Sequence, residues 1–144
     1  MNAPQKPPME KYRPHEGRLL DGADVGTADG ALHLVGSHCK HCDARTFPGN
    51  AICPFCLSED IETVPLSKQG SLYSFTFVHI APAAWEVPYG IGYVDLPEGV
   101  RLFGKLADAD SARWKIDQQV RVEVMTVPGM DGQAPQYQYF FNAA

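Results

Sequence analysis

The chain has 144 residues, of which 44% are hydrophobic, and a formal net charge of −5. A chain of this length can form one ordinary domain, or two very small domains that share an interface. No apolar run is long enough to span a membrane. Lys and Arg are scattered and form no basic stripe, which argues against binding to nucleic-acid phosphates. The first residues are polar and lack the apolar core of a signal peptide, so a cytoplasmic protein is expected.

Composition divides the chain into three segments. Residues 1–30 are polar and repeatedly interrupted by glycine, and are predicted to be an N-terminal arm or to fold against another part. Residues 31–68 contain every cysteine of the chain and are predicted to form a metal-binding ribbon. Residues 69–144 alternate between apolar and polar side chains, as strands with one buried face do, and are predicted to form the larger domain.

The four cysteines form two C-x2-C pairs, Cys39/Cys42 and Cys53/Cys56, with ten residues between the pairs. Such a pair turns backbone N–H groups toward its own sulfurs, so that two pairs can surround one tetrahedral ion without strain. Four thiolates complete the coordination of that ion and leave no position for water. Cys39, Cys42, Cys53 and Cys56 are therefore predicted to bind one structural metal ion.

The alternatives for these cysteines are disulfides, iron and a ligand other than cysteine. Disulfides require an oxidising compartment, which the polar N-terminus does not indicate. Rubredoxins hold iron with the same four thiolates, but usually carry Gly after the second cysteine of each pair, where this chain has Asp43 and Leu57. This difference favours Zn²⁺ over iron. His38 and His41 could provide a substitute ligand or a hydrogen bond to one, although four cysteines suffice.

Short strands are expected on either side of the metal site, at residues 31–35 and 62–66. This segment contains too few apolar residues to form a core of its own. Bound metal is therefore expected to hold it together.

The third segment is predicted to contain five strands. They cover residues 72–80, 89–96, 100–106, 119–126 and 136–141. A tight turn is expected at 97–99, and the connection at 107–117 is long enough for one helical turn. This arrangement favours a five-stranded OB-fold barrel, and a plain sheet or an SH3-like barrel remains possible. The predicted fold is thus mainly β, with a zinc ribbon followed by an OB-fold barrel.

The order of these parts resembles one protein family. A tetracysteine ribbon is followed by Gly70-x-Leu72-Tyr73-Ser74-Phe75-Thr76 and then by the run PYGIGYVDLPEGVRL at 88–102. This pattern is similar to the acyl-CoA-associated OB-fold proteins with an N-terminal rubredoxin-like zinc ribbon. The resemblance covers about residues 31 to 142 and depends on the order of the parts, because C-x2-C pairs alone are common.

The resemblance implies a non-catalytic accessory subunit. It would bind and organise a thiolase-superfamily enzyme, such as a thiolase or a CoA-ester aldolase or acyltransferase, in the degradation or synthesis of an unusual acyl-CoA. The partner would bind the CoA thioester, and the OB-fold barrel would border its CoA channel. The implied cofactor is one structural Zn²⁺, and no residue for CoA contact can be transferred from the family pattern.

The residues themselves also argue against catalysis by this chain alone. A nucleophile needs a base beside it, and every thiol is assigned to metal. His79 is expected on a strand, on one face with Tyr73, Phe75 and Phe77, as a polar member of a partly buried surface. The alternative functions are a free-standing module that binds single-stranded nucleic acid or an acyl chain through its aromatic residues, and an iron-loaded electron carrier. The apolar loop 81–88, which contains Trp85, could be a docking surface or a lid.

Overall fold

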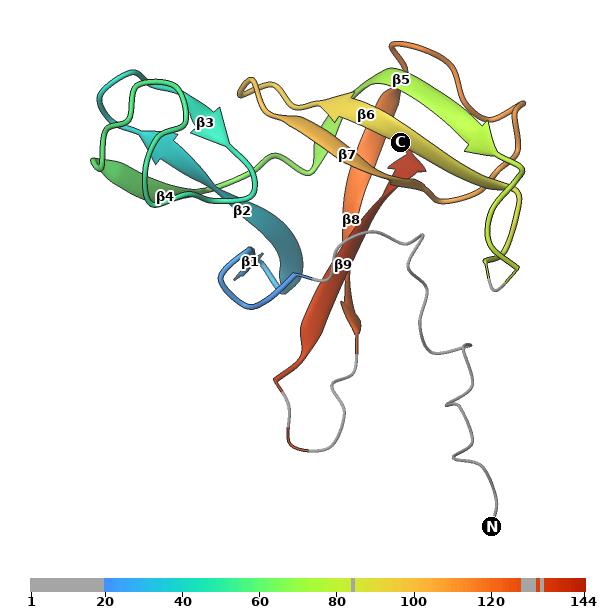
Figure 1. The fold of residues 1–144 in the computed structure, drawn as a ribbon, viewed down its shortest axis with the longest axis horizontal. Coiled ribbons are helices and arrows are strands. Elements are labelled where there is room, and N and C mark those ends of the chain that lie inside the picture. Colours follow the sequence, from blue (N-terminus) through green and yellow to red (C-terminus); the bar gives the residue numbers. More distant parts are fainter. Residues whose placement is uncertain (1–19, 84, 128–131, 133) are drawn as a thin grey trace.

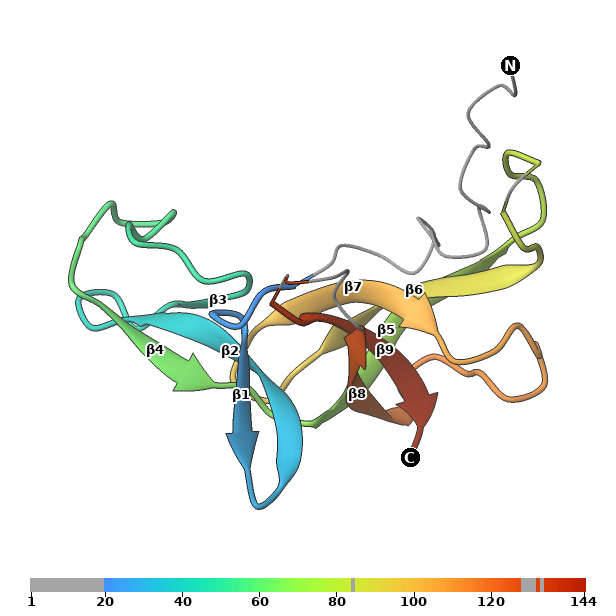
Figure 2. The same cartoon turned by 90° about the horizontal axis from the view of Figure 1, so that it is seen from below.

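The computed structural model describes residues 20–83, 85–127, 132 and 134–144. These residues form strands and turns, and none of them lies in a helix. Consequently, the described part of the chain offers no long apolar helix that could cross a membrane. Figures 1 and 2 show a small ribbon domain, built from β1 to β4, beside a barrel built from β5 to β9.

The ribbon is organised around its longest strand. This strand, β2 (Ala31–Cys39), pairs antiparallel with β1 (Val25–Ala28), β3 (Arg45–Thr46) and β4 (Ile61–Pro65). β1 and β2 are joined by Asp29 and Gly30, whose φ angles of 52° and 77° suit a tight two-residue hairpin. The strands expected at 31–35 and 62–66 are therefore present, and β2 continues directly into the first cysteine pair.

The barrel consists of five strands that close in the order β5-β6-β7-β9-β8. These strands are β5 (Gln69–Val78), β6 (Tyr89–Asp95), β7 (Arg101–Leu106), β8 (Gln119–Val127) and β9 (Gln136–Ala143). Each coincides with a strand that the alternating pattern predicts. The five-stranded barrel is confirmed, and the open sheet that the sequence allowed is excluded.

Closure of the barrel depends on a short parallel seam. β7 and β9 pair only through Lys105 with Phe140 and Leu106 with Phe141, whereas β8 pairs with β9 along eight residues. Phe141 is fully buried at this seam. A Cβ atom on Gly104 would lie 3.0 Å from the Phe141 ring, so the absence of a side chain there lets the ring fill the barrel.

The barrel interior and the ribbon share one hydrophobic core. Leu34 on β2 and Leu66 just after β4 belong to the same cluster of buried side chains as the barrel residues Leu72, Leu102 and Phe141. The backbone N–H of Leu66 donates to the carbonyl of Leu34 over 2.9 Å. The ribbon is therefore seated on the barrel through apolar contacts as well as through the chain connection.

The connection between β7 and β8 contains turns, so the single helical turn allowed by its length does not form. The carboxylate of Asp108 accepts a hydrogen bond from the Asp110 N–H, and that of Asp110 accepts one from the Ala112 N–H, both at 3.0 Å. Side chains that bond to nearby N–H groups in this way compete with helix formation. Trp114 anchors the connection, since it is 2% exposed and its indole donates to Asp108.

The end of the predicted N-terminal arm packs against both domains. Leu20 is 1% exposed and exchanges two backbone hydrogen bonds with Tyr137 of β9, at 2.7 and 2.9 Å. Strand β1 follows and was not predicted, because its four residues, VGTA, carry one large apolar side chain. Residues 1–19 lie outside the described residues, and the boundaries at 30 and 68 stay predictions.

A β-bulge changes the outward face of β5. The register between β5 and β6 shifts between Leu72 and Ser74, which leaves Tyr73 as the extra residue. Tyr73 is exposed, while Phe75 and Phe77 pack against the core. The prediction that these three rings share one face is therefore wrong. His79 follows the end of β5 and is exposed rather than part of a buried face.

The loop between β5 and β6, expected to be a docking surface or a lid, holds Trp85 against the barrel edge. The Trp85 and Tyr89 rings have centroids 6.1 Å apart, and Val87 is 42% exposed. Residue 84 of this loop is outside the described residues.

Gly92 tests the packing of the barrel wall. A Cβ atom there would lie 2.7 Å from the carbonyl oxygen of Ser74, a backbone atom that cannot move without disturbing the sheet. We expect Gly92→Ala to lower the free energy of unfolding by about 1 to 3 kcal/mol, as overpacking does. Gly22→Ala is the matched control, because nothing lies within 4 Å of its Cβ position. Urea unfolding that shows equal stability for the two variants would contradict this packing.

Candidate metal centre

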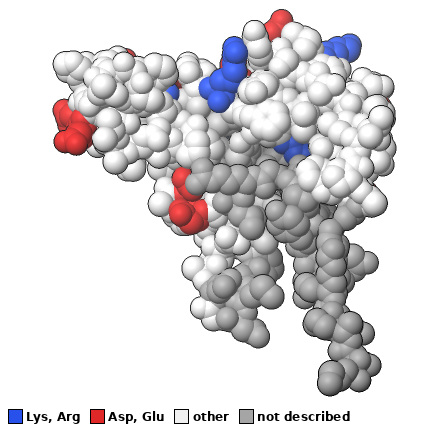
Figure 3. Space-filling view, viewed as in Figure 1, with Lys and Arg blue, Asp and Glu red and all other residues white. Residues whose placement is uncertain are grey.

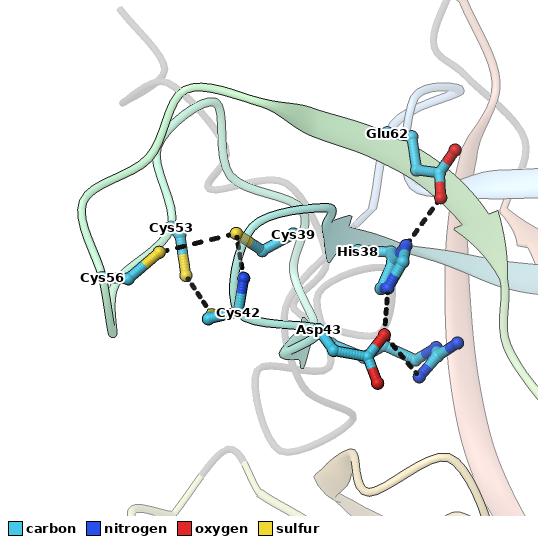
Figure 4. Close-up of polar contacts among 8 residues, drawn as sticks. His38, Cys39, Cys42, Asp43, Cys53, Cys56 and Glu62 are labelled. Carbon is cyan, nitrogen blue, oxygen red and sulfur yellow. Dashed lines mark hydrogen bonds and ion pairs between the residues drawn. The ribbon is translucent and has the colours of Figure 1, made fainter.

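The structure brings the four cysteine sulfurs together at the outer end of the ribbon (Figure 4). Cys39 ends β2, Cys42 lies in the turn after it, and Cys53 and Cys56 come from the loop that precedes β4. All four Sγ atoms lie within 4.8 Å of one another. The distances from Cys39 to Cys56 and from Cys42 to Cys53 are 3.5 and 3.6 Å.

Two backbone turns of the same design position these sulfurs. In the first, the Asp43 N–H donates to the Cys39 carbonyl over 2.9 Å, and in the second the Leu57 N–H donates to the Cys53 carbonyl over the same distance. The Cys42 N–H also points at the Cys39 sulfur, 3.5 Å away. Each pair is therefore held by its own local hydrogen bonds, as the C-x2-C spacing predicts.

Asp43 and Leu57 occupy the positions at which rubredoxin-like turns usually carry glycine. Both have a φ of 65°, in the left-handed region. This conformation costs a residue with a side chain about 1 to 2 kcal/mol. The backbone thus keeps the glycine-type turn without glycine, so these two residues do not by themselves distinguish zinc from iron.

The backbone also sets the acidity of the thiols. The N–H groups of Cys56 and Phe55 lower the pKa of Cys53 to about 6, and the N–H of Cys42 lowers that of Cys39. The pKa of Cys56 is raised to about 12, because desolvation and the three neighbouring thiols outweigh the N–H of Ser58. Four thiolates this close repel one another, and a bound cation would remove that repulsion.

The donor set fits one tetrahedral metal ion. A Zn–S distance of about 2.3 Å places the sulfurs of a tetrahedral site about 3.8 Å apart, which matches the arrangement observed. Cys39 and Cys53 are 1% exposed, whereas Cys42 faces solvent. Among the described residues, no His, Asp or Glu side chain joins this group of four. The arrangement suits a closed structural site better than a catalytic one, which would keep a position open.

His38 and His41, the two histidines beside the first pair, lie outside the sulfur group. His41 is exposed. The His38 ring bridges two carboxylates, with Nε2 2.5 Å from Asp43 and Nδ1 2.6 Å from Glu62 (Figure 4). These hydrogen bonds raise the pKa of His38 and lower those of Asp43 and Glu62. His38 therefore ties the first turn to β4, a role that sequence spacing could not indicate because Glu62 lies far along the chain.

Comparison with known proteins identifies the family. The rubredoxin-like zinc ribbon domain of ChsH2 matches residues 29–62, and the C-terminal OB-fold domain of ChsH2 matches residues 63–125. The chain belongs to the ChsH2 zinc-ribbon and OB-fold family. The resemblance inferred from the order of ribbon and barrel is confirmed.

Within the ChsH2 family, the chain is similar to a thiolase subunit and to a scaffold protein. It is 41% identical over 116 residues to the benzoylsuccinyl-CoA thiolase subunit BbsA of Thauera aromatica, a match that covers 80% of each chain. It is 37% identical to a DUF35 domain-containing scaffold protein of Methanocaldococcus jannaschii, over 60% of this chain and 64% of that protein.

Among solved structures, a chain of the Ltp2-ChsH2(DUF35) aldolase resembles this chain. The TM-score is 0.61 at 28% identity, and the match covers 77% of this chain and 84% of that one. The shared architecture thus includes most of the ribbon and barrel.

Substitution of one cysteine tests whether metal holds the ribbon. We expect Cys39→Ser to lose the bound metal and to expose the amides of β2 and β4 to hydrogen exchange, because metal affinity is folding free energy in such units. The barrel amides should stay protected. Metal content by mass spectrometry and hydrogen exchange measure both effects. His41→Ser, in the same turn, is the control and should keep one metal per chain; retained metal and protection in Cys39→Ser would refute the assignment.

Proposed function

We propose that this chain is a non-catalytic accessory subunit that binds and organises a thiolase-superfamily enzyme acting on an acyl-CoA. The observation that carries this proposal is the 41% identity to a subunit of benzoylsuccinyl-CoA thiolase, which extends over 80% of both chains. A match that covers four fifths of each protein supports a shared role in assembly, rather than a shared domain in unrelated proteins. The resemblance to a chain of the Ltp2-ChsH2(DUF35) aldolase adds support.

The distribution of reactive side chains agrees with a scaffolding role. All four thiols belong to the sulfur group of the ribbon. Among the described residues, His33 contacts a backbone carbonyl and His38 contacts two carboxylates, and neither forms a nucleophile–base pair with a hydroxyl group. We propose that the reaction takes place on the partner, which binds the CoA thioester, and that the OB-fold barrel borders the CoA channel.

The proposed cofactor is one structural Zn²⁺ held by Cys39, Cys42, Cys53 and Cys56. The short S···S distances and the full set of four thiol ligands support this assignment. Because thiolate ligands must stay reduced, we propose the cytoplasm as the compartment in which the protein works.

A protein partner is favoured over nucleic acid by the charge distribution. On the face drawn in Figure 3, Lys and Arg side chains form small separate groups, and most of the surface is uncharged. Binding of single strands requires a continuous basic groove beside the stacking rings. The net charge of −5 adds to this argument.

The proposal is tested by reconstitution with the thiolase-superfamily subunits of the source organism, each expressed separately. We expect one of them to form a stable complex with this chain on size exclusion, and its kcat/KM for acyl-CoA to rise at least about 10-fold, which corresponds to about 1.4 kcal/mol of transition-state stabilisation. Addition of the Cys39→Ser variant is the matched control and should restore less activity. A chain that stays monomeric and leaves every such enzyme unchanged would exclude the proposed function.

A further inference from the structure

Three aromatic side chains form a half-exposed cluster on the outer wall of the barrel. Tyr73 of β5 is 51% exposed, Tyr93 of β6 is 44% exposed and Phe103 of β7 is 50% exposed. Together with Arg101 of β7, they are called here the aromatic pad. Adjacent exposed rings on a folded protein indicate an interaction surface, because a water-exposed apolar patch is costly to maintain.

The strand register explains why these side chains gather. Tyr93 lies directly opposite Phe103, and their ring centroids are 5.1 Å apart. Asp95 lies opposite Arg101, one step further along the same face. Tyr73 is the bulged residue of β5 and is exposed, and the Arg101 guanidinium carbon lies 3.7 Å from the centroid of its ring. The pad therefore includes the bulge of β5, a feature often found beside functional sites.

Contacts within the pad hold Arg101 in one place before any partner binds. Arg101 donates two hydrogen bonds to the Asp95 carboxylate, at 2.6 and 3.0 Å, while its flat face stacks on Tyr73. Strand residues fixed in this way lose little conformational entropy on association. Tyr and Arg are also the residue types enriched among those that dominate binding energy at protein interfaces.

The charges of Arg101 and Asp95 limit the kind of partner surface that the pad can bind. Its cation is neutralised by Asp95, whose pKa Arg101 keeps below its usual range, so the paired carboxylate is ionised at neutral pH. A phosphate placed on Arg101 would therefore meet a negative charge immediately beside it. An uncharged protein surface, with apolar side chains for the rings and a polar group for the tyrosine hydroxyls, complements the pad.

We propose that the aromatic pad is the docking surface for the catalytic acyl-CoA subunit of the complex. This inference rests on the proposed function, since it names the part of the chain that the partner covers. The pad lies on the first three strands of the barrel, including the β6–β7 wall that corresponds to strands 2 and 3 of an OB fold, the region that such folds use for ligands. It assigns partner recognition to the barrel rather than to the cysteine turns.

The test uses the full chain and the thiolase-superfamily subunit that it binds in the reconstitution. We expect Phe103→Ser to weaken the dissociation constant of the complex at least 10-fold, and Tyr93→Ser to do the same. Ile116→Ser is the matched control, because Ile116 is 54% exposed in the loop before β8 and outside the pad; it should change the affinity less than threefold. Thermal unfolding and metal content of each variant, measured on the same samples, establish that the fold is intact.

The outcomes separate this inference from the proposed function. If the wild-type chain binds the enzyme and both pad variants bind it within threefold of wild type, the pad is refuted and the accessory role stands. If the wild-type chain binds no thiolase-superfamily subunit, both fail. Tight binding of a single-stranded oligothymidine that Phe103→Ser abolishes would also overturn the pad as a protein-docking surface. Should Phe103→Ser unfold, Tyr73→Ser provides the same comparison, and Phe103→Tyr, which keeps the ring, should bind as the wild type does.

Discussion

The convergence of four sulfurs is the constraint on which the ribbon depends. Apart from Leu34, the buried positions between residues 31 and 65 are a glycine, a serine and two of the cysteines, so this domain has almost no hydrophobic core. The sulfur group instead joins the end of β2 to the loop before β4, two places that are separate along the chain. A metal ion can supply several kcal/mol at such a point, which hydrophobic burial could not provide in so small a unit.

The ribbon and the barrel pack against each other. Leu34 and Leu66 bury their side chains in the barrel core, and Leu20 bridges to β9, so the strands that carry the cysteines also help to cover the barrel. His38 adds a polar tie between the first cysteine turn and β4. The strands that carry the cysteines therefore border the barrel core, while the proposed pad lies on barrel strands that do not touch the sulfurs. Metal binding therefore concerns the ribbon, and the proposed docking surface belongs to the barrel.

Sequence reasoning located the elements whose pattern is local. The cysteine pairs, the five barrel strands and the turn at 97–99 each depend on neighbouring residues, and the structure contains all of them. What it missed depends on contacts between distant residues or on a break in the pattern. Strand β1 forms by pairing with the edge of β2. The His38 ring is held by a hydrogen bond with Glu62, which lies far along the chain. The bulge at Tyr73 reverses an alternation that looks regular in the sequence. The helical turn that the length of the connection allows does not form, because Asp108 and Asp110 bond to the backbone instead.

The strand pairing of the barrel combines local pieces with two long-range seams. Neighbouring strands β5, β6 and β7 form a meander, and β8 and β9 form a hairpin, so both pieces are built from contacts close in sequence. Two short seams join these pieces, because β7 pairs with β9 through two residue pairs and β5 pairs with β8 through three. Contacts of this kind carry a loop-closure cost that is met before they contribute any stability. We therefore expect both seams to form after the meander and the hairpin, and the burial of Phe141 in the core to accompany this closure.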